Sequence, residues 1–141
     1  MEEGDSAMNR DALSKQTASF GVPWEEEYGY SQAVKVGDTI YIAGQISHDD
    51  EGNVVGDGDM ELQMRQTYEN IQKVLGNYGA TMENLVDEVL YVTDMEAAMA
   101  ARAKIGRDVF SGFPTIASTI VQIERLAFPE PMIEIKVVAK L

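Results

Sequence analysis

One acidic side chain, Glu134, stands out because it lies on the second face of an alternating run, beside Val138. Every second residue from Ile133 to Ala139 is apolar, so Ile133 and Ile135 share one face of an expected strand and Glu134 lies on the other. A carboxylate in such a strand either forms a cross-strand ion pair or does chemistry, such as ordering water and moving a proton. Spacing alone favours the ion pair.

Other candidate residues lie at the ends of expected strands and helices. They are polar or small, namely Tyr30, Gly44, Gln45, Arg102 and Ser118. None is diagnostic alone, since a serine in a strand is explained by β-propensity and a Gly-Gln pair by a bulge or strand end.

Common catalytic and metal-binding motifs are missing from the sequence. There is no Gly-x-Ser-x-Gly, and the single histidine, His48, lies in an acidic turn, so a histidine-dependent triad is not expected. The run from His48 to Asn53 lacks the glycine position and the closing glutamate of a calcium loop, which favours a solvated turn. Gly56-Asp-Gly58 carries an acid that would repel phosphates. The sequence therefore predicts no metal and no cofactor.

Composition narrows the classes of function further. The chain has 141 residues, which fits one domain, and no apolar run reaches the ~20 residues of a membrane-spanning helix. Its 24 acids and 11 bases give a formal charge of −13, which disfavours binding to nucleic acid. Cysteine is absent and the first six residues resemble no targeting signal. We expect a cytoplasmic protein without nucleic-acid or membrane partners.

Hydrophobic periodicity predicts the elements that must position the candidate residues. They are a β-hairpin over 32–36 and 39–43, a helix from its N-cap Asp59 to Gly79, a strand over 85–92, a helix from its N-cap Asp94 to Val109, and strands over 117–124 and 132–140. The short connection predicts that the last two strands pair antiparallel. The order β-β-α-β-α-β-β predicts an α/β (α+β) sandwich with both helices on one face of a mixed sheet.

Two further expectations concern the chain's ends and its surfaces. Residues 1–22 are polar and form an N-terminal arm, with a short helix over 10–17 as an alternative, whereas residues 23–141 form the single domain. The uncovered face of the sheet should be partly apolar. The residues expected there are Ile40, Ile42, Val89 or its neighbours, Val121 and Ile123. Exposed apolar surface of this kind predicts a homo-oligomer, with a site between subunits.

Five short matches in one order give the sequence a family resemblance. The matches are Tyr30-Ser-Gln32, Ile42-Ala-Gly-Gln-Ile46, Asn70 with its helix, Val92-Thr-Asp-Met95 and Ile133-Glu-Ile135. Over residues 23–141 the chain resembles the RidA (YjgF/YER057c/UK114) family. The resemblance implies a chorismate mutase-like fold and a homotrimer with three small-molecule clefts at its subunit interfaces.

The same resemblance implies roles for individual residues. Members of the best-known branch are deaminases that hydrolyse reactive enamines and imines to 2-keto acids and ammonia. By position, Glu134 matches the glutamate that orders and activates water, Tyr30 matches a tyrosine lining the cleft, and Gly44 matches a glycine whose backbone approaches the ligand.

The chain departs from the family pattern at the arginine that binds the substrate carboxylate. Ser118 stands at that position, and a serine cannot form a bidentate charged clamp. Arg102 falls where the branch has an asparagine, and it either supplies the missing charge or faces solvent. Two functions stay open: a hydrolase acting on a small imine or carbonyl metabolite, with Ser118 hydrogen-bonding the ligand, and a non-catalytic metabolite-binding or regulatory trimer. Some relatives are called endoribonucleases, which the charge of −13 disfavours here.

Overall fold

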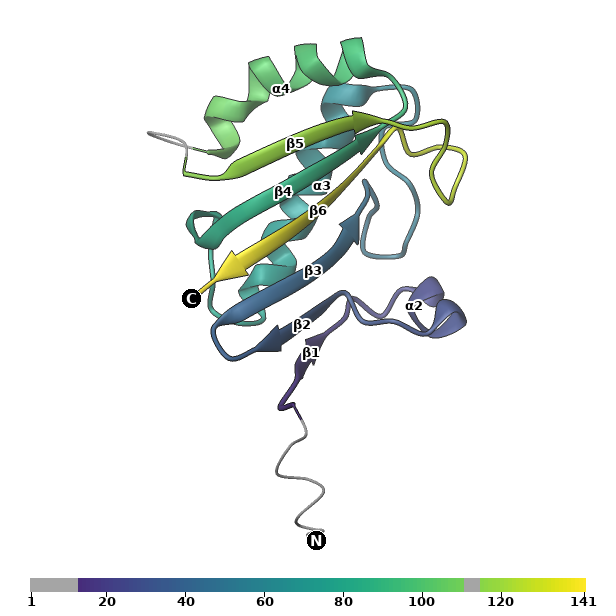
Figure 1. The fold of residues 1–141 in the computed structure, drawn as a ribbon. Helices are drawn as coiled ribbons and strands as arrows, with labels where there is room; N and C mark the ends of the chain where they lie inside the picture. The colour runs from purple at the N-terminus through teal and green to yellow at the C-terminus, as the bar shows by residue number, and fades with distance from the viewer. Residues whose placement is uncertain (1–12, 111–114) are drawn as a thin grey trace, which may run out of the picture.

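Six strands form one mixed sheet, and two long helices pack side by side on one of its faces (Figure 1). This computed structural model describes residues 13–110 and 115–141. The elements are β1 (Gln16–Ala18), α2 (Pro23–Tyr28), β2 (Ala33–Val36), β3 (Thr39–Gln45), α3 (Met60–Gly76), the 3-10 turn η1 (Met82–Asn84), β4 (Leu85–Val92), α4 (Met95–Val109), β5 (Ala117–Gln122) and β6 (Ile133–Lys140). The predicted mixed sheet with both long helices on one face is confirmed.

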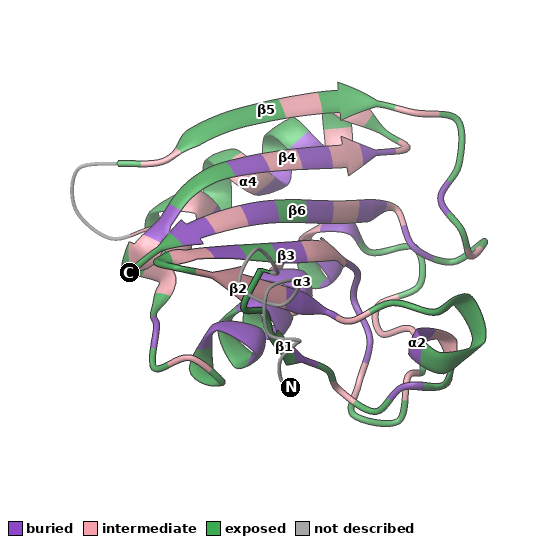
Figure 2. Ribbon diagram, turned by 60° about the horizontal axis from the view of Figure 1, so that its bottom comes forward, coloured by how far each residue is buried: buried purple, intermediate pink, exposed green. Residues whose placement is uncertain are grey.

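The hydrophobic core fills the space between the sheet and these helices. Ile133 and Ile135 of β6 are fully buried, and so are Met64, Ile71 and Leu75 of α3. Figure 2 shows the resulting alternation of buried and more exposed residues along β6. Burial of such side chains contributes roughly 1.5–3 kcal/mol each, so the packing of β6 against α3 contributes substantially to the stability of the fold.

Both predicted helix caps are present. The Asp59 carboxylate accepts a hydrogen bond from the Leu62 amide at 3.1 Å, and the Asp94 carboxylate accepts one from the Ala97 amide at 3.1 Å. Each satisfies an amide that the first helical turn leaves without a partner. α3 ends at Gly76, slightly before the expected end at Gly79.

The prediction that the last two strands pair with each other is wrong. β6 lies between β3 and β4 and is antiparallel to both, whereas β5 pairs parallel with β4 at the edge of the sheet. The segment from 123 to 132 is long enough to pass the end of β4, and the central position lets Ile133 and Ile135 be buried against the helices. Burial of the most apolar strand therefore overrides the local tendency to form a hairpin.

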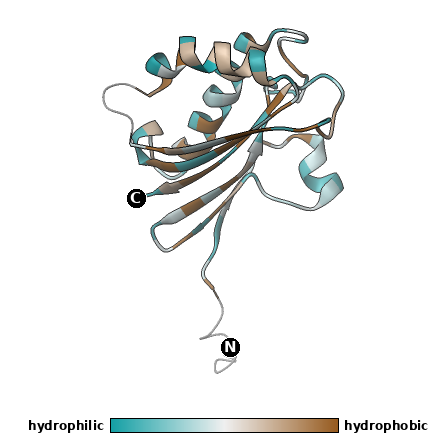
Figure 3. Ribbon diagram, turned by 45° about the horizontal axis from the view of Figure 1, so that its top comes forward, coloured by the Kyte–Doolittle hydropathy of each residue, from teal (hydrophilic) through white to brown (hydrophobic). Residues whose placement is uncertain are grey.

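The face of the sheet opposite α3 and α4, which we call the open face, differs partly from expectation. Ile40 and Ile42 are fully buried on the helix side. The register of the strands instead places a set of partly exposed residues on the open face, namely Tyr41, Val89, Tyr91, Val121 and Val138. Ile123 lies beyond the end of β5. Figure 3 shows hydrophobic stretches along several strands, and the register makes the open face partly apolar with other residues than those expected.

The sheet begins within the segment that composition assigned to an arm. Gln16–Ala18 is strand β1 and pairs antiparallel with β2, so the alternative helix over 10–17 is not found in its described part. Residues 1–12, which hold the remainder of that segment, lie outside the described residues. The short helix α2 was not expected. It begins at Pro23, which suits a first helical position, and is followed by Gly29 at φ +74°.

One buried amide side chain, Gln63 of α3, joins three segments of the chain. Its Nε2 donates to the carbonyls of Gly56 (3.0 Å) and Glu130 (3.1 Å), and its Oε1 accepts from the Met132 amide (2.7 Å). Gln63 is fully buried. It therefore fixes the loop before β6 against α3.

We expect Gln63→Met to lower the free energy of unfolding by about 2 kcal/mol, because the substitution keeps the volume but leaves three partly buried backbone groups without their side-chain partner. Urea denaturation measures this change. Gln72→Met is the matched control, since Gln72 is exposed on the same helix and its replacement should change stability by less than about 0.5 kcal/mol. Equal effects of the two variants would contradict the assigned role of Gln63.

Candidate functional site

A pocket of about 200 Å³ opens where β3 ends and β6 begins. Its lining comes from α2 and the residues that follow it, the end of β3, the loop before β6, and β6 itself. The lining residues are Trp24, Tyr28, Tyr30, Gly44, Ile46, Leu126, Ala127, Phe128, Pro131 and Glu134. The structure thus brings together three of the predicted site residues, Glu134, Tyr30 and Gly44.

Aromatic rings form much of the wall. Trp24 meets Phe128 edge-on at a centroid distance of 5.3 Å, and Tyr28 and Tyr30 complete the aromatic lining. Behind Trp24 lies His48, whose ring packs edge-on against Trp24 at 5.4 Å and is only 3% exposed. The sequence placed His48 in a solvated turn. The acids Asp50 and Glu51 are exposed as expected, but the imidazole is buried and supports the wall.

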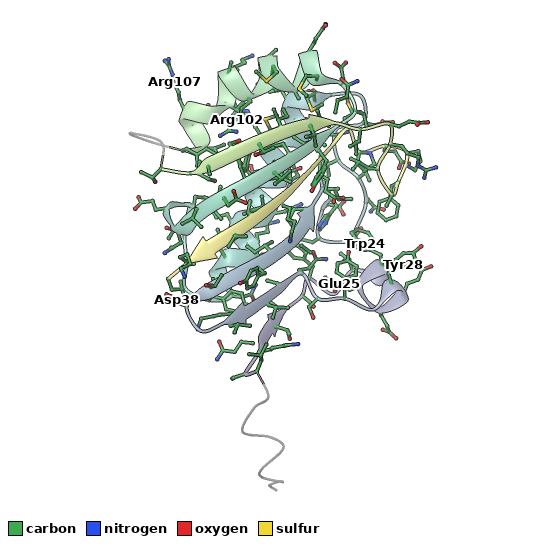
Figure 4. The ribbon with its side chains drawn as sticks, in the orientation of Figure 1. Trp24, Glu25, Tyr28, Asp38, Arg102 and Arg107 are labelled. Atoms are coloured by element: carbon green, nitrogen blue, oxygen red, sulfur yellow. The ribbon has the colours of Figure 1, made fainter. Side chains whose placement is uncertain are left out.

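A chain of buried polar side chains attaches this wall to the sheet. The Glu25 carboxylate of α2 accepts hydrogen bonds from the amides of Phe20 (2.8 Å) and Gly21 (2.9 Å) and from Nε2 of Gln32 (2.8 Å). Gln45 Nε2 in turn donates to Gln32 Oε1 at 2.8 Å. Gln45 is therefore a supporting residue that does not line the pocket. Figure 4 shows Trp24, Glu25 and Tyr28 together on α2, the helix that these hydrogen bonds attach to the sheet.

Glu134 lies directly over Gly44. A methyl group at position 44 would clash with the Glu134 carboxyl group, with its carbon only 2.6 Å from Cδ. The backbone angles of Gly44 suit other residues, so close approach explains this glycine. The contact arises at a bulge, because two residues of β3, Ala43 and Gly44, oppose one residue of β6, Lys136, between the pairs Ile42–Val137 and Gln45–Ile135.

The cross-strand ion pair that spacing favoured for Glu134 is not found. Within residues 13–110 and 115–141, no hydrogen bond or ion pair to its carboxylate is present, and its neighbour on β4 is Tyr91. Burial raises the pKa of Glu134 above the ordinary value of 4.5, and Lys136 on the same strand opposes that rise. Burial, with Glu25 and Glu134 nearby, also raises the pKa of Tyr30. A carboxylate left free of partners in a pocket is available to a ligand or a water molecule.

The other two predicted site residues, Ser118 and Arg102, meet each other away from this pocket. Ser118 of β5 lies opposite Glu88 of β4 and faces the helices, and Arg102 of α4 approaches its Oγ at 3.5 Å. Within one subunit they are thus separated from Glu134 by the sheet. Figure 4 shows Arg102 directed towards the sheet, whereas Arg107 on the same helix points away.

Arg102 is not a solvent-facing residue. One of its terminal nitrogens donates to Glu88 Oε2 at 2.6 Å, and its guanidinium lies 5.0 Å from the Phe110 ring centre. Glu88 is fully buried and also accepts a hydrogen bond from the Tyr68 hydroxyl at 2.8 Å. Sequence reasoning missed Glu88, although its place two residues before buried Leu90 marked it as inward-facing.

We expect Arg102→Met to lower the free energy of unfolding by about 3 kcal/mol, because it leaves the buried Glu88 carboxylate without its cation. Urea denaturation of Arg102→Met, Glu88→Gln and the double variant measures the coupling. The double variant should be more stable than Arg102→Met alone, and Arg107→Met should change little because Arg107 is exposed. Additive effects at positions 88 and 102 would contradict the pairing.

We expect Glu134→Gln to raise the melting temperature at pH 7. The raised pKa means that the folded chain binds more protons than the unfolded chain between pH 4.5 and the folded-state pKa, so stability falls as pH rises through that interval. Glutamine carries no charge at position 134, so it removes the cost of burying an ionised carboxylate there. The increase in melting temperature should vanish below pH 4.5, where Glu134 is protonated in both the folded and the unfolded chain. Melting curves across pH test this, with exposed Glu124→Gln as the control. A gain that does not depend on pH would contradict it.

Clusters of metal-ligating side chains and membrane-spanning helices are both absent from the part of the chain that the structure describes. No group of three or more histidine, cysteine or acidic side chains is placed there to hold a metal ion, and none of the described helices has the length and apolar character needed to span a membrane.

Comparison with known proteins places this geometry in a family. The family model described as Endoribonuclease L-PSP matches residues 24–141. A RutC family protein of Pyrococcus abyssi is 33% identical over 110 residues, which cover 78% of this chain and 84% of the relative. The RutC family protein YjgH of Escherichia coli is 28% identical over 115 residues, which cover 82% and 85%.

Solved structures agree with the sequence relatives. Rv2704 of Mycobacterium tuberculosis, a member of the YjgF/YER057c/UK114 family, has a TM-score of 0.79 and 27% identity, with coverage of 91% of this chain and 100% of that one. The Rid family protein YyfA of Yersinia pestis has a TM-score of 0.73 and 30% identity, with coverage of 80% and 88%. The chain therefore belongs to the YjgF/YER057c/UK114 (RidA) family.

Proposed function

We propose that this protein binds a small imine or carbonyl metabolite in the aromatic pocket and hydrolyses enamines or imines there, with Glu134 positioning the attacking water. One observation carries the proposal. The Glu134 carboxylate is half-buried, faces a pocket and has no partner among the described residues. Because leaving such a group unpaired costs stability, a role in the site accounts for it better than a structural role does.

The overall reaction converts a protonated imine and one water molecule into a carbonyl compound and an ammonium ion. Glu134 takes a proton from water while the water oxygen bonds to the imine carbon and the electron pair of the carbon–nitrogen double bond moves to nitrogen. The same carboxyl group then returns the proton to that nitrogen. The remaining carbon–nitrogen bond breaks as the hydroxyl group of the intermediate becomes the carbonyl and its proton passes to ammonia.

The surroundings of Glu134 suit this role. Its raised pKa makes the carboxylate a stronger base than an exposed glutamate, which is closer to the optimum for proton transfer near neutral pH. The raised pKa of Tyr30 keeps the hydroxyl protonated, so it can donate a hydrogen bond to the ligand. Gly44 leaves the space that the carboxyl group occupies.

The open face supports self-association. Tyr41 is 50% exposed and Val121 is 38% exposed on this face, and such apolar surface is commonly covered by another subunit. We take the assembly to be a homotrimer in which the pocket lies near a subunit interface, and the protein to act in the cytoplasm. Cleavage of RNA is not part of the proposal, because the formal charge of −13 would repel a polyanion.

A non-catalytic metabolite-binding or regulatory role is the second candidate. It is favoured by the sparse chemistry of the pocket. Among the lining residues that the structure describes, only Glu134, Tyr28 and Tyr30 carry groups that titrate. Binding needs no more than this, whereas a hydrolase must also guide the proton to the leaving nitrogen.

Ammonia release from freshly generated imines, with and without protein, tests the first candidate. We expect Glu134→Gln to lower the protein-dependent rate by about 100-fold or more, which is the usual contribution of a general base. Wild-type activity should also fall as the pH is lowered through the raised pKa of Glu134. An unchanged rate in Glu134→Gln would show that the assigned role is wrong.

Gly44→Ala provides a second test, because its methyl group must displace the Glu134 carboxyl group. We expect the hydrolysis rate to fall at least tenfold without loss of the fold. Gly76→Ala is the matched control, since nothing lies within 4 Å of a methyl group placed there. If imines release ammonia no faster with wild-type protein while a small ligand still raises its melting temperature, the second candidate stands.

A further inference from the structure

We infer that the pocket selects a cation on an apolar group, such as the protonated imine of an aromatic or aliphatic amine, and rejects ligands that carry a carboxylate. The inference rests on the proposed site and names its substrate class. The first observation is the charge of the lining. Glu134 is the one charged side chain among the described lining residues, and no lysine, arginine or histidine accompanies it.

The bases nearest to the pocket along the chain do not line it. The Arg125 guanidinium donates to the carbonyls of Leu126 (3.1 Å) and Ala127 (3.5 Å) in its own loop. Lys136 lies two residues from Glu134 on the same strand face, but it is exposed and does not line the pocket. Arg102 is on the other side of the sheet, bound to Glu88. Within one subunit, a ligand carboxylate in the pocket would therefore contact Glu134 and no cationic side chain of the lining.

The second observation is the aromatic wall. Trp24, Tyr28, Tyr30 and Phe128 all line the pocket with Glu134. The face of an aromatic ring attracts a cation, and several rings around one carboxylate are a recurring arrangement for binding ammonium groups. The remaining lining, which includes Ile46, Leu126 and Pro131, is apolar and suits the hydrocarbon part of the same ligand.

The two observations together define the preferred ligand. A protonated imine carries positive charge on its carbon and nitrogen, and this charge makes the carbon reactive towards water. Glu134 attracts the charged group and also receives the proton of the attacking water. The imine of an amino acid carries a carboxylate that this lining does not neutralise. The substrate class is thus amine-derived imines, and the products are an aldehyde or ketone and ammonium.

The experiment uses the single tryptophan of the chain, Trp24, which lines the pocket and whose fluorescence reports occupancy directly. Full-length protein is titrated at pH 7 with benzylammonium, benzyl alcohol and benzoate, three probes of similar shape and different charge. We expect benzylammonium to produce a saturable change in Trp24 fluorescence. Benzyl alcohol should bind more weakly, and benzoate should bind at least tenfold more weakly than benzylammonium. Added salt should weaken only the benzylammonium response.

Glu134→Gln should reduce the preference for benzylammonium over benzyl alcohol at least fivefold while it leaves the affinity for benzyl alcohol nearly unchanged. Glu124→Gln is the matched control, because it removes an exposed acid outside the pocket and should keep the preference. Benzoate binding as tight as benzylammonium binding, or no saturable response to benzylammonium, would overturn the inference.

The readout separates this inference from the proposed function. If the protein prefers benzylammonium but does not accelerate imine hydrolysis, the inferred ligand class stands and the catalytic proposal is wrong. If the protein hydrolyses imines of amino acids and prefers benzoate, the catalytic proposal stands and the inferred ligand class is wrong.

Discussion

The contact between the Glu134 carboxyl group and Gly44 is the constraint on which the site depends. It exists because β6 pairs with β3 across an irregular register, in which two residues of β3 oppose one of β6. The absence of a side chain at Gly44 leaves room for the carboxyl group beside the β3 backbone. The buried position of β6, set by its apolar face against α3, determines where this contact occurs. The core and the site are thus built on the same strand.

The buried and half-buried acids of this chain have different environments, and the difference distinguishes acids that support the fold from the acid proposed to act in the pocket. Glu25 accepts three hydrogen bonds, and Glu88 is bound by Tyr68 and Arg102. Both are satisfied, and each fixes a helix, α2 or α4, to the rest of the fold. Glu134 has no such partner among the described residues, and burial raises its pKa. A fold that satisfies two acids and leaves a third free in a pocket retains a local instability that a ligand or water can relieve.

Family membership determines the fold of this chain, whereas the side chains that line the pocket determine which ligand it binds. The match over residues 24–141 and the TM-scores of 0.79 and 0.73 to related structures establish the shared fold. The ligand depends on side chains that the fold does not determine. In this chain the aromatic rings of α2 and of the loop before β6 surround a single negative charge. Two of the supports that hold those walls, Gln63 and Glu25, lie outside the pocket, so changes in selectivity need not alter the core.

The sequence by itself determined the type and approximate bounds of most elements, both helix caps, and the face of β6 on which Glu134 lies, because periodicity and capping are local properties. The family motifs also placed Tyr30, Gly44 and Glu134 in one site. Only the tertiary structure decided that β5 pairs with β4 instead of β6, that His48 is buried, and that Arg102 and Ser118 meet Glu88 on the helix side. These outcomes depend on which distant strands become neighbours and on which acid finds a cation. Competition among long-range contacts determines the strand neighbours and the ion pairs, and the spacing of residues along the chain does not reveal the result of that competition.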